Sequence, residues 1–179
     1  RVQKTSRTFA ACLGDATRTI NMIAPTINVD GVISAAEEAR IPVLDRGYLY
    51  GDSVYEVFRT YNGVPLFLTD HFERLEHSAR LIHMQISQSR ETLLAEIKRT
   101  AHVAGVSATN NAYVRYQISR GVGQIDLYPD PKLETRFVVI IKALPEWPAE
   151  HYARGVHMLI PATHRNPISA LDPNIKGGN

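Results

Sequence analysis

The sequence has little cysteine, no long apolar run and no excess of either charge. Cys12 is the single cysteine among 179 residues, which excludes an intrachain disulfide framework and a paired-cysteine metal site. One cysteine is typical of a reducing compartment, so we expect a cytoplasmic protein. Lysine and arginine number 20 against 18 aspartates and glutamates, and this net charge of +2 does not indicate nucleic-acid binding.

Apolar runs such as Phe137–Ile141 and Met158–Pro161 are far shorter than the roughly 18 residues of a membrane span. We therefore expect no membrane partner. The sequence also lacks a P-loop, a dinucleotide-binding glycine fingerprint, a zinc-protease HExxH and a hydrolase GxSxG. Its seven histidines are scattered, and we expect no metal site.

Two turn dipeptides predict β-hairpins. Asp30-Gly31 separates the apolar stretches 26–29 and 32–34, and Asn62-Gly63 separates 54–61 from 64–68. A helix is predicted from Asp70, with Glu73 completing its cap, and a second from an N-cap at Ser89 to a stop at Gly105. Strands are predicted at 112–119 and 136–144, and the run 137–141 is expected to be buried on both faces.

The order of these elements predicts an α/β or α+β domain followed by part of a second unit. Residues 1–25 are interpreted as an N-terminal extension, 26–144 as the small domain and 145–153, which hold two prolines, as an interdomain linker. Residues 154–179 are then the start of a large domain, with a strand at 155–163.

Two strand faces are candidate pocket walls. The first carries Tyr55, Val57, Arg59 and Tyr61, and the second carries Tyr113, Arg115, Gln117 and Ser119. An arginine beside a tyrosine suits the binding of a carboxylate, but from the residues alone a half-exposed, solvated sheet face is the favoured explanation. By pattern alone Arg74 is a surface arginine and Lys176 a loop lysine. The residues themselves leave these alternatives open.

Four segments in order resemble the fold-type IV pyridoxal-phosphate (PLP) aminotransferases, which include the branched-chain and D-amino-acid aminotransferases. They are LDRGYLYGDSVYE at 44–56, DHFERL at 70–75, YVR with SRG at 113–121, and NIK at 174–176. The resemblance covers the chain from about residue 26 onward. It implies the α+β small domain of that fold, followed by the first part of the large PLP-binding domain.

The resemblance also implies roles for individual residues. Lys176 matches the lysine that attaches to PLP and moves a proton between the substrate Cα and the cofactor. Arg74 matches the arginine that binds the PLP phosphate. The substrate positions that it implies are Tyr50, Tyr55, Val57, Tyr113 and Arg115.

The function implied is transamination between an amino acid and a 2-oxo acid such as 2-oxoglutarate, by a homodimer. The stretch 121–126 lacks the basic pair common in D-specific members, and Tyr113-Val114-Arg115 resembles the branched-chain pattern, which favours an apolar L-amino acid. The alternatives are a D-amino-acid or amine transaminase, an aminodeoxychorismate-lyase-like enzyme, or a non-catalytic binding domain. The family continues into a large domain after the lysine, and we expect that part to exist as another chain or to have been lost.

Overall fold

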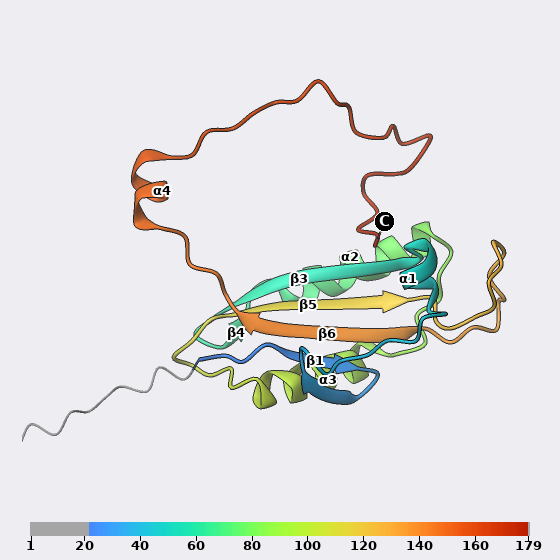
Figure 1. Ribbon diagram of the computed structural model, residues 1–179, viewed down its shortest axis with the longest axis horizontal. Helices are drawn as coiled ribbons and strands as arrows, with labels where there is room; N and C mark the ends of the chain where they lie inside the picture. The colour runs from blue at the N-terminus through green and yellow to red at the C-terminus, as the bar shows by residue number, and fades with distance from the viewer. Residues whose placement is uncertain (1–21, 179) are drawn as a thin grey trace, which may run out of the picture.

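The structure is a computed structural model that describes residues 22–178. Within these residues, six strands form an antiparallel sheet in the order β2-β1-β6-β5-β3-β4 (Figure 1). In chain order they are β1 (Thr26–Val29), β2 (Val32–Ala35), β3 (Ser53–Tyr61), β4 (Val64–Pro65), β5 (Ala112–Ser119) and β6 (Arg136–Ala143). The predicted mixture of helices and strands in one sheet-based domain is confirmed.

The helices are α1 (Arg46–Tyr50), α2 (Leu68–Leu81), α3 (Arg90–Val103) and α4 (Ala149–Arg154). The two long helices lie on one face of the sheet, α2 against β3 and α3 against β1 and β6 (Figure 1). No helix within residues 22–178 is long and apolar enough to cross a membrane.

Both predicted hairpins are present because their turn residues take up positive φ angles. Asp30 and Gly31 have φ of 48° and 93°, and Asn62 and Gly63 have φ of 50° and 77°, as a two-residue hairpin turn requires. The return strand after Asn62-Gly63 is shorter than predicted. It ends at Pro65, and Leu68 already begins α2.

The starts of the two long helices differ in how well they were predicted. Ser89 caps α3 as expected, since its Oγ accepts a hydrogen bond from the amide of Thr92 at 3.2 Å. The prediction that Asp70 caps α2 is wrong. Phe67 precedes that helix in a left-handed conformation without a side-chain cap, and Asp70 lies in the first turn, where its charge favours the helix dipole.

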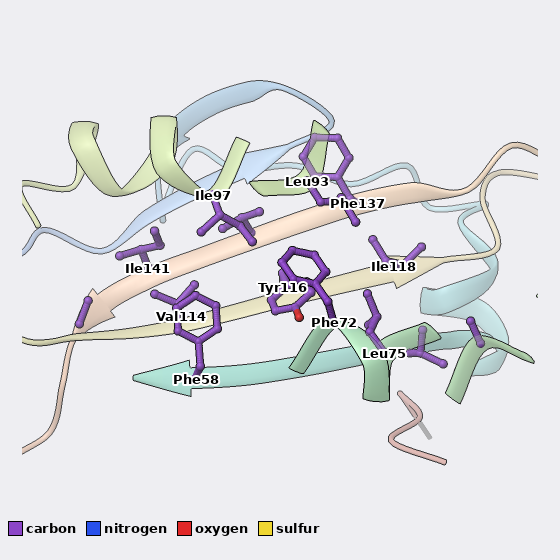
Figure 2. Close-up of a cluster of buried hydrophobic side chains, with 14 of the residues drawn as sticks. Phe58, Phe72, Leu75, Leu93, Ile97, Val114, Tyr116, Ile118, Phe137 and Ile141 are labelled. Atoms are coloured by element: carbon purple, nitrogen blue, oxygen red, sulfur yellow. The ribbon is translucent and has the colours of Figure 1, made fainter. Parts of the chain in front are cut away.

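The hydrophobic core fills the space between α2, α3 and one face of the sheet (Figure 2). Tyr116 of β5 is fully buried there, with its ring 5.3 Å from that of Phe72 and 6.2 Å from that of Phe58. Each large apolar side chain buried in this way contributes about 1.5–3 kcal/mol to folding. The residues labelled in Figure 2 are Phe58, Phe72, Leu75, Leu93, Ile97, Val114, Tyr116, Ile118, Phe137 and Ile141.

The other face of the sheet, which we call the open face, is not covered by α2 or α3. Along β6, Phe137 and Val139 are buried on the core side, whereas Val138 and Ile140 on the open face are only half-buried. The prediction that 137–141 is buried on both faces is therefore wrong. The open face carries Tyr55, Val57, Arg59, Tyr113, Arg115, Gln117, Val138 and Ile140.

After β6 the chain leaves the sheet in a long exposed arc and returns to it at 176–178 (Figure 1). Helix α4 falls largely within the range predicted as a linker. The strand predicted at 155–163 is absent, because apolar residues such as Met158 and Ile160 find no partner strand and stay exposed. The backbone of 176–178 instead pairs with the start of β3, where Gly177 bridges to Val54.

The N-terminal extension predicted at 1–25 falls mostly outside the described residues, which begin at residue 22. Within it, Ile23 is buried in the core, and the amide of Ala24 donates a hydrogen bond to the carbonyl of Ala104. Residues 23 and 24 are therefore packed as part of the small domain. The remaining domain boundaries stay predictions.

Candidate active site

A buried carboxylate, Glu56, joins three basic side chains. Its Oε1 accepts a hydrogen bond from Nε of Arg74, and its Oε2 accepts a second from Nη2 of the same guanidinium at 2.7 Å. Nδ1 of His71 lies 2.8 Å from Oε2, and Nζ of Lys176 lies 3.3 Å from it. Strand β3, helix α2 and the C-terminal segment thus meet at one carboxylate, and they bring together the predicted Lys176 and Arg74.

The charge on Glu56 is stabilised by these partners although its side chain is wholly buried. Burial raises the pKa of Glu56, but hydrogen bonds from Arg74 and His71 and the positive charges of Lys176 and Arg74 outweigh this effect. The pKa falls from 4.5 to about 2. In return, the hydrogen bond to Glu56 raises the pKa of Arg74. Glu56 is therefore a carboxylate at neutral pH.

Main-chain hydrogen bonds hold the segment that carries Lys176 against β3. The carbonyl of Lys176 accepts from the amide of Tyr55 at 3.0 Å, and the amide of Gly178 donates to the carbonyl of Ser53 at 2.9 Å. The amide of Lys176 donates to Oγ of Ser78 on α2 at 3.2 Å. The lysine side chain remains 28% exposed, so its amine is fixed in place and still accessible.

The close approach of this segment to β3 requires a glycine. A Cβ added at Gly178 would lie 2.1 Å from Oγ of Ser53, well inside van der Waals contact. Gly178 therefore permits the pairing that places Lys176 beside Glu56.

Arg74 retains hydrogen-bonding capacity for an external anion. Its Nε and Nη2 are engaged by Glu56, but its Nη1 has no hydrogen-bond partner within residues 22–178. Half of its side chain is exposed. A guanidinium fixed on one edge and open on the other is suited to a phosphate.

The open face brings three of the predicted substrate residues together beside the lysine. Val57 and Arg115 are direct partners on β3 and β5. The guanidinium carbon of Arg115 lies 3.8 Å from the ring centroid of Tyr55, and Nζ of Lys176 lies 5.4 Å from the same centroid. Tyr55 therefore contacts both the arginine of the open face and the lysine of the Glu56 cluster.

The other two predicted substrate residues lie further away. Tyr113 is on the open face opposite Arg59, and Nζ of Lys142 lies 5.2 Å from its ring centroid. Tyr50 ends α1, where its ring packs under Arg46 with the guanidinium carbon 4.7 Å from the ring centroid. Within the described part of the chain, neither tyrosine has a hydrogen bond or ring contact with Lys176. Their role as substrate residues stays a prediction.

Sequence reasoning did not select Glu56 or His71 as site residues. A signal for Glu56 was present, because it alternates with Tyr55 and Val57 and must therefore face the core side of β3. A charged residue on a core face requires a partner. Its partners come from α2 and from residue 176, and the local pattern of β3 does not identify them.

The family model for class IV aminotransferases matches residues 53–179. A putative branched-chain-amino-acid aminotransferase of Methanocaldococcus jannaschii is 30% identical over 153 residues, which are 86% of this chain and 51% of that protein. A D-alanine aminotransferase of Staphylococcus aureus is 33% identical over 132 residues, which are 73% of this chain and 45% of that protein. The chain belongs to the class IV aminotransferase family.

Solved structures agree with this assignment. The branched-chain aminotransferase of Thermoproteus uzoniensis, with norvaline, has a TM-score of 0.59 and 27% identity, over 69% of this chain and 42% of that one. The 4-amino-4-deoxychorismate lyase of Pseudomonas aeruginosa has a TM-score of 0.59 and 26% identity, over 73% of this chain and 44% of that one. The chain spans about half the length of the curated relatives it matches.

Class IV aminotransferases use PLP, and the donor groups of this site fit that cofactor. The accessible amine of Lys176 suits its aldehyde, and the half-exposed guanidinium of Arg74 suits its phosphate. With Glu56 ionised, the two cations exceed the carboxylate by one positive charge, which favours an anion. The residues present therefore agree with the cofactor of the family.

Proposed function

We propose that this chain is part of a PLP-dependent aminotransferase that moves an amino group between an amino acid and a 2-oxo acid such as 2-oxoglutarate. One observation supports this most strongly: Glu56 holds the amine of Lys176 and the guanidinium of Arg74 on a single carboxylate. PLP supplies the electron sink that such a reaction requires.

In this proposal each residue of the cluster has one task. Lys176 would hold the cofactor through its amine and would serve as the base that moves a proton at the substrate Cα. Arg74 binds the phosphate through its free edge. Glu56 holds both cations in place, and His71 donates to Glu56 and so supports its orientation.

The open face forms the substrate wall in this proposal. Arg115 binds a carboxylate of the substrate, while Tyr55 and Val57 contact its apolar part, and Tyr113 and Tyr50 complete the wall at a greater distance. The absence of a basic pair at 121–126 supports a branched-chain or other apolar L-amino acid as donor.

A homodimer acting in the cytoplasm is a further part of the proposal. The half-buried apolar residues Val138 and Ile140 on the open face are compatible with cover by a second subunit. The single cysteine is compatible with a reducing compartment.

Borohydride reduction followed by peptide mass spectrometry tests the role of Lys176. After incubation with PLP, we expect the mass of the reduced cofactor on the peptide that contains Lys176. Lys176→Ala should abolish it, whereas Lys142→Ala, which removes an exposed lysine of β6, should leave it unchanged. A reduced adduct and a cofactor absorption band that persist in Lys176→Ala would exclude this lysine. Absence of any adduct in the unaltered protein would favour a non-catalytic binding domain.

A lyase acting on an aminodeoxychorismate-type substrate is the second candidate. It is supported by the similarity to the Pseudomonas aeruginosa lyase, which covers 73% of this chain. Release of pyruvate without an added amino acceptor would favour the lyase, whereas product formation that depends on a 2-oxo acid would favour the aminotransferase.

A further inference from the structure

Gln117 connects two parts of the open face through both ends of its amide. Its Oε1 accepts a hydrogen bond from Nη2 of Arg115 at 2.9 Å, and its Nε2 donates one to Oγ of Ser53 at 2.9 Å. Arginine can only donate, so the oxygen end of the amide must face Arg115. The amide is therefore used in one defined orientation.

Ser53 gives this connection a rigid anchor. It is the first residue of β3, it is 1% exposed, and its carbonyl accepts the amide of Gly178. Ser53 thus contacts Gln117 through its side chain and the lysine segment through its backbone. Through Gln117, the guanidinium of Arg115 is connected to the segment that positions Lys176.

Arg115 needs such support because its side chain is long and flexible. The ring of Tyr55 lies against the face of the guanidinium, and Gln117 holds one of its edges. Nη1 and Nε of Arg115 have no hydrogen-bond partner among residues 22–178 and remain for a ligand. Face and edge contacts together define one orientation of the guanidinium, which neither contact defines alone.

We infer that Gln117 is a positioning residue, which fixes the orientation of Arg115 for a substrate carboxylate and uses Ser53 as its anchor. This inference rests on the proposed function, in which Arg115 binds that carboxylate. Gln117 itself does not need to touch the substrate. It therefore affects how tightly a carboxylate binds more than how fast the bound substrate reacts.

Binding of isocaproate, a branched carboxylate without an amino group, tests the inference by calorimetry on the PLP-loaded protein. Gln117→Leu removes both hydrogen bonds and shortens the side chain by one atom. We expect its Kd for isocaproate to rise about tenfold, as for loss of a hydrogen bond to a charged group. The KM for an apolar amino acid should rise by a similar factor while kcat stays within about twofold.

Two further variants serve as controls. Gln85→Leu replaces an exposed glutamine of the loop between α2 and α3 and should leave isocaproate binding unchanged. Ser53→Ala leaves Gln117 bonded to Arg115 but removes its anchor, so the Kd should rise about threefold, less than in Gln117→Leu.

Unchanged isocaproate binding in Gln117→Leu would overturn the inference, and unchanged binding in Ser53→Ala would overturn the role of the anchor. Weaker binding together with a lower yield of the reduced Lys176 adduct would assign Gln117 a general folding role, which also contradicts the inference. Failure of the proposed function has a different result, because the unaltered protein then forms no adduct on Lys176.

Discussion

Nζ of Lys176 lies 3.3 Å from Oε2 of Glu56, although 120 residues separate them in the chain. Their contact joins the last described segment to strand β3. The same oxygen also accepts a hydrogen bond from Arg74. One carboxylate therefore sets the spacing between an amine and a guanidinium that come from different elements.

Glu56→Gln should destabilise the fold, because it keeps the shape of the side chain and removes its charge. We expect the free energy of unfolding to fall by about 2 kcal/mol, since charged partners lose a buried acceptor. Urea denaturation measures this change. Glu73→Gln, at an exposed position of α2, is the control and should change stability by less than about 0.5 kcal/mol. Equal stability of the two variants would contradict the central role of Glu56.

Stability should depend on pH through the same carboxylate. The pKa of Glu56 is about 2 in the folded protein against 4.5 when unperturbed. A lowered folded pKa gives a stabilisation that is complete above about pH 4.5, decreases as the pH falls, and is lost below about pH 2. The loss is on the order of 3 kcal/mol. Unfolding curves between pH 5 and pH 2 should show this extra loss in the unaltered protein and not in Glu56→Gln.

Arg74→Gln should weaken the binding of PLP more than that of pyridoxal, which lacks the phosphate. We expect an increase of about 10- to 100-fold in the Kd for PLP and little change for pyridoxal, since the lost contact is with the phosphate. Arg74→Lys should give an intermediate value, because it keeps the charge and loses the planar fork. Arg80→Gln, at an exposed position later in α2, is the control. An equal loss of affinity for PLP and for pyridoxal would show that Arg74 stabilises the fold and does not bind the phosphate.

Gly178→Ala should loosen the lysine segment, since the added Cβ would lie 2.1 Å from Oγ of Ser53. We expect faster hydrogen exchange at the amide of Tyr55, which now donates to the carbonyl of Lys176, and a lower yield of the reduced adduct. Gly155→Ala is the matched control. An added Cβ meets nothing within 4 Å there, so its positive φ causes only local strain. Unchanged exchange in Gly178→Ala would show that the segment can shift without losing its pairing.

The sequence predicted those parts of the fold that depend on neighbouring residues. The positive φ angles of Asp30-Gly31 and Asn62-Gly63, the cap at Ser89 and the alternation along β3 and β5 are local properties. The start of α2 was not predicted correctly. Phe67, the residue before the helix, has a left-handed backbone conformation, which no local rule assigns to phenylalanine.

Features that depend on distant parts of the chain were harder to predict. An apolar run such as 137–141 has the same composition whether one face or both are covered, and only the positions of α2 and α3 decide this. For the site, Lys176 and Arg74 came from the family resemblance. The contacts of Glu56 with α2 and Lys176, and that of Gln117 with Ser53, could not be predicted, because they join segments far apart in the sequence.

Residues 176–178 pair with the start of β3, so the register of this pairing decides where the side chain of Lys176 lies. The long exposed arc before it can absorb insertions or deletions with little effect on the rest of the chain. A single residue added between Lys176 and Gly178 would instead break the alternation along the paired segment and direct the amine to the opposite side of the sheet. Length variation is therefore tolerated in the arc before Lys176 but not between Lys176 and Gly178.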